Sequence, residues 1–354
     1  MKRRRVMTCI ICAIVIIMST VALFLVLDTE NKITLENIEE QKNKDSMDGT
    51  YYEVKGVNSP KITEAMIPVY WDDNGNEIEY NSDNFVYDNW YDYSQDKWAN
   101  AKTKDGSYWV WIPRYAYCLD TDNNIKIEYL RNLSLLSSNS EITFVNELGK
   151  DNWNIHPAFS YVDSENLLQL SGIWVAKYEM GYENNSGKEF ELNNIFNQNV
   201  NLVSKPDVPA WTLISIDNVY LNSILYDNTK NSHLIKNTEW SAMVYLEYAN
   251  ELQENLYSVQ GLNNDIEEFV SAYLKNAELF NSTEFVNGEP KYLDIYENKV
   301  NKYGDGIIET KAINTKSSEF LTNAKPYLVR TNSFGYTNCS GLPHENRGFR
   351  IVLW

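Results

Sequence analysis

Short apolar runs rich in aromatic and β-branched residues recur along the chain from residue 60 onward, and Asn, Asp and Gly separate them. This pattern predicts short strands joined by turns and loops, because such side chains suit a pleated surface. A turn is expected at 72–76, where Gly75 can adopt a positive φ. The ranges with the strand pattern are 66–71, 89–93, 97–101, 107–112, 326–330 and 348–354.

Helical periodicity is confined mainly to two segments. Residues 238–249 place apolar side chains on one helical face, and Asn237 or Thr238 can cap this helix. Residues 267–274 show a weaker helical pattern. Many short strands, few helices and long loops therefore predict one α+β domain over residues 60–354.

The N-terminus has a different pattern. Residues 6–27 carry no charge, and about 22 such residues can cross a bilayer as a helix. Basic residues precede the run and acidic residues follow it, which predicts a cytoplasmic N-terminus and an extracytoplasmic remainder. A cleaved signal peptide is the alternative, but the run is long and lacks a small-x-small cleavage site. We therefore expect a basic tail (1–5), a transmembrane helix (6–27), a stalk (28–59) and the main domain (60–354).

The composition agrees with a folded domain that does not bind nucleic acid. Of the 354 residues, 43% are hydrophobic and 23% are charged. The hydrophobic share is large enough to form a buried core, unlike that of a disordered chain. The formal net charge is −18, and so acidic a surface repels phosphate backbones. The simplest role for this negative charge is to keep the protein soluble. The alternative is that acidic loops hold a cation.

Five phrases in a fixed order give the chain a more specific signature. They are W-I-P-R at 111–114, G-I-W-V-A-K-Y-E at 172–179, N-T-E-W at 237–240, N-D-I-E-E-F-V at 264–270 and R-G-F-R-I-V at 347–352. Together they resemble the motifs of formylglycine-generating, sulfatase-modifying proteins, and more closely those of bacterial and phage surface-protein relatives. The resemblance covers residues 60–354 and implies a C-type-lectin-like fold.

The cysteines depart from this family. Its oxidising members hold copper with two nearby cysteines, because thiolates favour Cu(I). The matching stretch of this chain, 334–341, contains only Cys339, and Cys118 lies far earlier. The resemblance therefore implies a protein without catalysis, with a divergent oxidase as the alternative. Whether Cys118 and Cys339 form a disulfide stays open, because only the fold decides whether they meet.

Other chemical motifs are weak. The three histidines, His156, His233 and His344, show no metal-ligand spacing, and the first two have the positions of strand- or helix-entry residues. Glu267 and Glu268 are adjacent, so on a helix they cannot flank one bond as a glycosidase pair does.

Calcium is the cofactor that the resemblance implies. The family's loop supplies oxygen ligands to a structural Ca²⁺, and Asn264, Asp265 and Glu268 stand at the matching positions. Calcium prefers several hard oxygen ligands, which amide and acidic side chains provide. The alternative is that these side chains cap a helix that follows them.

The resemblance also indicates where a ligand would bind. Asn332, Phe334, Tyr336 and Asn338 fall in the loop that carries binding or variable residues in this fold. The aromatic content of 13% suits carbohydrate stacking, but most of these residues lie in strand phrases, which favours burial. We expect a membrane-anchored extracytoplasmic binding or adhesion module for a peptide, glycan or protein. A structural subunit of a surface appendage is a further alternative.

Overall fold

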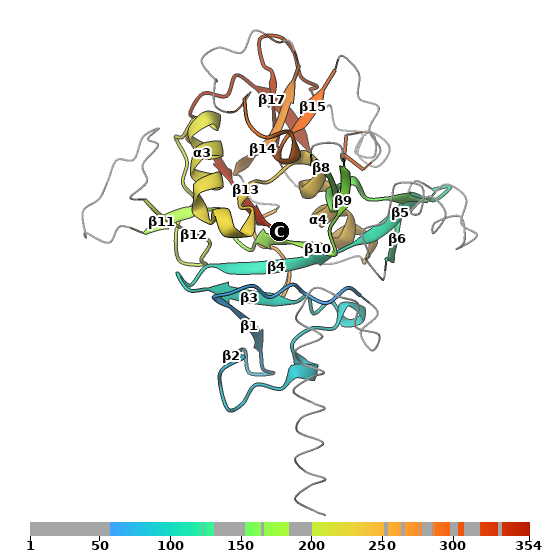
Figure 1. Cartoon of the computed structure of the whole chain (residues 1–354), viewed down its shortest axis with the longest axis vertical. Coiled ribbons are helices and arrows are strands. Elements are labelled where there is room, and N and C mark those ends of the chain that lie inside the picture. Colours follow the sequence, from blue (N-terminus) through green and yellow to red (C-terminus); the bar gives the residue numbers. More distant parts are fainter. Residues whose placement is uncertain are drawn as a thin grey trace, which may run out of the picture. The chain divides into compact units, whose positions relative to one another are not determined.

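The computed structural model shows an α+β architecture, with many short strands, long loops and two α-helices among the described residues (Figure 1). The chain divides into two compact units, residues 1–47 and 48–354, and all described residues lie in the second. The described residues are 57–122, 124–130, 153–163, 166–183, 200–250, 254–262, 266–275, 277, 285, 287–297, 304–307, 319–331 and 335–354.

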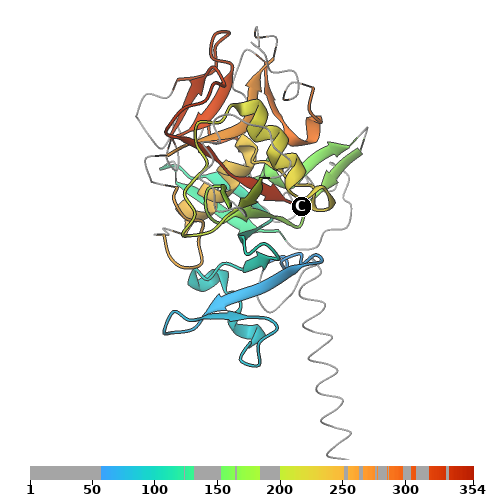
Figure 2. The ribbon, with the colours of Figure 1, turned by 90° about the vertical axis from the view of Figure 1, so that its left-hand side faces the viewer.

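A seven-stranded antiparallel sheet forms the larger layer. Aromatic and β-branched side chains alternate between its faces, which is why these short runs form strands. Figure 1 and Figure 2 both show β1 and β2 on one side of β4, with the two helices beyond it on the other side. The strand order is β13 (His233–Leu234), β19 (Ile351–Leu353), β10 (Gly172–Ala176), β4 (Tyr108–Pro113), β3 (Asn100–Thr103), β1 (Met66–Trp71) and β2 (Glu77–Glu79).

A second sheet of five strands is built around β14 (Glu267–Leu274). The weak helical pattern of this segment gave a wrong prediction. Seven of its eight residues are buried, and partners line both edges, so neighbouring strands override local periodicity. The other strands are β15 (Asp294–Tyr296), β16 (Tyr327–Arg330), β17 (Tyr336–Cys339) and β18 (Arg347–Phe349).

Smaller sheets complete the strand inventory of the described residues. The three-stranded one contains β5 (Tyr115–Leu119), β6 (Ile125–Tyr129) and β7 (Asn154–Ile155). The hairpins are β8 (Ser160–Asp163) with β9 (Asn166–Gln169), and β11 (Gly181–Glu183) with β12 (Asn201–Val203). Five short 3₁₀ helices are also present there, η2 (Tyr87–Asn89), η3 (Tyr93–Gln95), η4 (Pro157–Phe159), η5 (Asn228–Lys230) and η6 (Pro290–Tyr292).

The predicted strands at 66–71, 107–112 and 326–330 are confirmed as β1, β4 and β16, and the closing segment forms β18 and β19. The segments 89–93 and 97–101 are mostly irregular instead, with η3 between them and β3 starting only at Asn100. Asp92 accounts for the difference, because its carboxylate accepts a hydrogen bond from the Ser94 amide and turns the chain.

Helix α4 (Asn237–Ala249) is the predicted helix, but its cap differs from the prediction. Lys236 is the N-cap residue, and its backbone N–H donates to the Glu239 carboxylate at 2.8 Å. The Asn237 side chain bonds other segments instead, and the Thr238 amide donates to Asp294. The first turn is therefore capped by carboxylates from Glu239 and Asp294.

Helix α3 (Ile216–Tyr226) was not predicted, because Asn218, Asn222 and Ser223 interrupt its apolar pattern. Within the helix these polar groups bond the preceding turn. Asn222 donates to the Asn218 carbonyl at 2.6 Å, and Ser223 donates to the Val219 carbonyl at 2.7 Å. Such bonds satisfy the buried polar atoms, so these residues are compatible with a helix although they break its apolar sequence pattern.

Aromatic residues form much of the core, as the sequence predicts. The most deeply buried side chains include six tryptophans, Trp90, Trp98, Trp109, Trp111, Trp174 and Trp240. In the second phrase, Gly172 lies against β4, where an added Cβ would come within 2.4 Å of the Trp111 ring. Glycine is therefore required there by close approach of two strands.

Arg350 joins the two large sheets, since it is the single residue between β18 and β19. Its fully buried guanidinium donates to both Glu268 oxygens, at 2.9 and 3.1 Å. It also donates to the carbonyls of Lys177 and Gln260. The closing phrase thus ties together three segments that are distant in sequence.

Lys177 of the second phrase is also buried. Its ammonium donates to Asn100 Oδ1 at 2.8 Å and to the Leu256 carbonyl, and it lies 4.1 Å from the centre of a Trp71 ring. Burial lowers the pKa of Lys177 to about 7. Each of the five phrases therefore places an ionisable side chain inside the core: Arg114, Lys177, Glu239, Glu268 and Arg350.

The predicted transmembrane helix at 6–27 and the stalk at 28–59 lie almost wholly outside the described residues. Within the residues that are described, no helix has the length and apolar character needed to span a membrane. Membrane anchoring therefore stays a prediction from the sequence.

Candidate functional site

The turn between β3 and β4 begins the candidate site. Asp105 in this turn accepts hydrogen bonds from the Thr103 hydroxyl at 2.6 Å and from the Ser107 backbone and hydroxyl at 3.1 and 3.0 Å. Gly106 has φ +83°, a conformation that favours glycine and lets the chain reverse. The turn is consequently held rigid by its own side chains.

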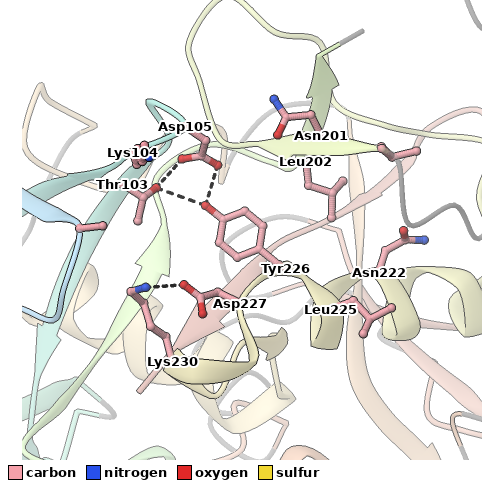
Figure 3. A pocket seen from close by; sticks show the side chains of 12 residues that line it. Thr103, Lys104, Asp105, Asn201, Leu202, Asn222, Leu225, Tyr226, Asp227 and Lys230 are labelled. Carbon is pink, nitrogen blue, oxygen red and sulfur yellow. Dashed lines mark hydrogen bonds and ion pairs between the residues drawn. The ribbon is translucent and has the colours of Figure 1, made fainter. Parts of the chain in front are cut away.

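Tyr226, the last residue of α3, reaches this turn from the opposite wall (Figure 3). Its hydroxyl donates to Asp105 at 2.8 Å and lies 3.2 Å from the Thr103 hydroxyl, while its ring packs at 5.5 Å against Trp109. Burial, reinforced by the Asp105 charge, raises the pKa of Tyr226, so the phenol stays protonated. The network joins α3 to the central sheet.

A second charged pair closes one end of the site. Lys230 donates to Asp227, and Asp227 also accepts from the Thr229 hydroxyl at 2.6 Å. Partial burial by itself would raise the pKa of Asp227. The hydrogen bonds and the Lys230 charge outweigh this effect, so the pKa lies below its ordinary value. Asp227 is therefore an ionised and already occupied carboxylate.

Between these groups lies an open cavity of about 370 Å³, a size typical of small-ligand sites. The rest of its lining is Ala65, Lys104, Val200, Asn201, Leu202, Asn222 and Leu225. Figure 3 shows the side chains of Asn201, Leu202, Asn222 and Leu225 along one side of the pocket and the Asp105–Tyr226 network along the other. Ala65 has φ +64°, which is uncommon for a residue other than glycine and occurs often at ligand sites.

The chemistry of this pocket suits binding by hydrogen bonds. Its two carboxylates, Asp105 and Asp227, are each matched by donors within the protein. Asn201 offers an amide donor and acceptor, Asn222 adds the capacity left after its bond to the Asn218 carbonyl, and Leu225 adds an exposed apolar surface. A polar, uncharged ligand with several hydroxyl or amide groups fits this combination best.

The ligand residues predicted from the sequence lie elsewhere. Tyr336 and Asn338 are on β17 and are buried, and the Asn338 amide donates to the Phe320 carbonyl at 2.6 Å. Asn332 and Phe334 lie outside the described residues. Neither Tyr336 nor Asn338 lines the pocket around Tyr226. Their contact with a ligand stays a prediction.

The predicted calcium ligands are only partly described. Asn264 and Asp265 lie outside the described residues, and Glu268 is buried against the Arg350 guanidinium. A cation bound by Glu268 would lie beside this positive charge, so Glu268 fits a calcium site poorly. In the described part of the chain, no group of three or more His, Cys, Asp or Glu side chains is placed to hold a metal ion.

Cys118 and Cys339 lie on β5 and β17, which belong to different sheets, and they form no disulfide with each other. Burial raises the pKa of Cys339, which disfavours the thiolate that copper requires. The residues present therefore do not fit the copper site of the oxidising proteins that the sequence resembles. His156 and His233 are buried at the start of η4 and in β13, as their sequence positions predict.

Sequence reasoning did not predict the pocket around Tyr226. The only local signal is the T-x-D-G-S turn at 103–107, which reads as an ordinary turn. The other wall comes from α3 and η5, which follow more than a hundred residues later. Nothing in the spacing of these segments indicates that they meet.

Comparison with known proteins adds little to this geometry. No family model matches the chain, and no curated protein matches it. Among solved structures, PvdO from Pseudomonas aeruginosa is similar over 72% of this chain and 97% of its own, with 11% identity and a TM-score of 0.31. A similarity this low carries no argument about family or function.

Proposed function

We propose that the protein is a membrane-anchored, extracytoplasmic binding module and that the pocket around Tyr226 is its recognition site. The uncharged run at 6–27 and the basic tail support the anchor and its orientation. The five phrases support a C-type-lectin-like body related to the sulfatase-modifying proteins. Such a body would hold the recognition site away from the membrane surface on a stalk.

The observation that carries the binding role is the prearranged hydrogen-bond frame of the pocket. Asp105 and Tyr226 fix its two walls before any ligand arrives, so little conformational entropy is lost on binding. Asn201 and Asn222 both line this space, and the Asn222 amide keeps the hydrogen-bonding capacity left after its bond to the Asn218 carbonyl. A saccharide fits this arrangement, because its hydroxyls pair with amides and its C–H faces pack on Leu225 and Leu202.

The test uses the full-length chain in lipid nanodiscs and a panel of neutral saccharides, and saturation-transfer NMR measures their binding. We expect at least one saccharide to bind and Asn222→Ala to weaken it roughly tenfold, the effect of one or two lost hydrogen bonds. Asn84→Ala is the matched control, since Asn84 is exposed and outside the pocket lining.

Two results would contradict the proposal. One is a panel in which no saccharide shows saturable binding. The other is a bound saccharide whose affinity is lost on Asn338→Ala and unchanged on Asn222→Ala, which would move recognition to the C-terminal segment. Orientation is tested separately, because protease added outside intact cells should cleave the main domain if it is extracytoplasmic.

A further inference from the structure

A second cavity of about 570 Å³ lies away from the Tyr226 pocket, and the two share no lining residue. Its walls come from three places: η4 with the β8–β9 hairpin, the start of α4, and the segment from η6 into β15. These elements also contact one another, since α4 packs on η4 and β8 packs on η6. The cavity is therefore part of the folded body.

Most of this cavity is apolar. Pro157, Leu167, Pro290, Leu293 and Ile295 contribute hydrocarbon surface to the lining. Tyr161 adds an aromatic wall that is fixed in place, because its ring stacks on Trp354 at 4.7 Å with an interplanar angle of 21°. A ligand that fills this space would gain free energy from burying an apolar body.

The lining of this cavity has more basic than acidic residues, although the chain as a whole is acidic. The whole chain has 49 acidic and 31 basic residues, yet two of the three charged lining residues are Lys236 and Lys291. The third, Asp294, accepts a hydrogen bond from the Thr238 amide at 2.7 Å. Asp294 thus caps α4, and the two lysines provide the strongest donors in the cavity.

Lys236 is almost fully buried, with its ammonium 5.1 Å from the Trp354 ring centre. Its nearest carboxylate oxygen belongs to Glu239 at 3.7 Å, which is beyond hydrogen-bond range. Glu239 is engaged elsewhere, because it lies 3.1 Å from His233 Nε2 and accepts from the Trp354 indole and the Lys236 amide. The Lys236 ammonium therefore retains hydrogen-bonding capacity toward the cavity.

Lys291 is more accessible. It pairs at 3.0 Å with Glu289, whose side chain is 67% exposed, and it lies 4.8 Å from the Tyr292 ring centre. Exposed pairs of this kind are weak, so a ligand anion can compete with Glu289 for the ammonium. The cavity thus combines one deep and one accessible cation with an apolar wall.

We propose that this second cavity binds a small organic carboxylate with an apolar body, whose charge is met by Lys236 and Lys291. A carboxylate matches two ammonium donors, and a hydrocarbon or aryl group matches the proline- and leucine-lined wall. The site is independent of the saccharide pocket, so either proposal can fail without the other.

The experiment measures binding of 3-phenylpropionate to the full-length chain in nanodiscs by isothermal titration calorimetry, with empty nanodiscs as the blank. The neutral amide of the same acid is the matched ligand. We expect saturable binding of the acid and at least roughly tenfold weaker binding of the amide, because a charge-assisted hydrogen bond is lost.

Three variants locate the site. Lys291→Met should weaken binding of the acid roughly tenfold, and Leu167→Trp should abolish it by filling the cavity. Lys126→Met is the control of equal charge change, since Lys126 is exposed on β6 and outside the lining. Unfolding midpoints of all variants show whether the fold is kept.

The proposal is overturned if the acid shows no saturable binding, or if acid and amide bind equally well. It is also overturned if folded Lys291→Met and Leu167→Trp proteins bind the acid as tightly as the parent chain. Asn222→Ala should leave binding of 3-phenylpropionate unchanged, which separates this site from the Tyr226 pocket.

Discussion

Replacing Arg350 by Met should destabilise the protein strongly. The guanidinium is fully buried and is bonded to both oxygens of Glu268. It also donates to the main-chain carbonyls of Ala176, Lys177 and Gln260. A methionine fills similar space but supplies no donor, so the carboxylate and the carbonyls would all lose a hydrogen bond inside the core.

The magnitude follows from the burial of the pair. Removing one partner of a buried ion pair costs about 3–5 kcal/mol, because the other charge stays uncompensated. Arg347, three residues earlier, provides an internal control. It pairs with Glu267, and the two side chains are 10% and 29% exposed, so solvent screens this pair more than the fully buried one and its loss should cost about 1 kcal/mol. Arg350→Met should therefore cost roughly 3 kcal/mol more than Arg347→Met.

Urea unfolding of the full-length chain, followed by tryptophan fluorescence, measures this difference. With a slope near 3 kcal/mol per molar urea, the Arg350→Met midpoint should fall by about 1 M or more, and that of Arg347→Met by about 0.3 M or less. Adding Glu268→Gln to Arg350→Met should restore part of the loss, since a neutral amide is cheaper to bury than a carboxylate. Equal midpoints for the two arginine variants, or no recovery, would refute the reasoning.

Other substitutions have expected outcomes as well. Gly172→Ala forces a methyl group into an indole and a carbonyl of β4 and should cost about 2–3 kcal/mol, whereas Gly75→Ala meets open space and should cost only about 1 kcal/mol from its positive φ; equal thermal midpoints would contradict this. Burial lowers the pKa of Lys177 to about 7 in the folded protein. Between pH 7 and the ordinary pKa of lysine, the unfolded chain therefore binds more protons than the folded one, so the free energy of unfolding should rise with pH over this range. Urea midpoints at pH 7 and pH 9 should show a smaller rise in Lys177→Met. Asn237→Ala removes the acceptor of Arg330 Nε and should cost about 1–3 kcal/mol by urea unfolding; an unchanged midpoint would oppose that role.

The local sequence pattern was sufficient to predict those strands whose apolar runs are bounded by turns. The segment 66–71 is an example, since the Asp72 carboxylate and Gly75 form the predicted turn behind it. Pattern failed for β14, because burial on both faces removes the alternation typical of a strand and leaves only a weak, misleading helical pattern. It also failed for α3, whose buried Asn222 and Ser223 are satisfied only inside the helix.

The candidate site was beyond sequence reasoning for a different reason. Asp105 and Tyr226 are 121 positions apart, and each has an unremarkable local context. Their hydrogen bond depends on how α3 packs beside the β3–β4 turn, which is a tertiary property. The resemblance directed attention to Tyr336 and Asn338, but both side chains are buried on β17.

The place of β19 within the large sheet has a consequence for biosynthesis. β10 pairs with β4 on one edge and with β19 on the other, and β19 follows it by about 175 residues. At typical translation rates those residues take roughly 10–35 s to emerge from the ribosome. Throughout that interval β10 lacks its β19 partner, and its unpaired edge is open to pairing with other chains.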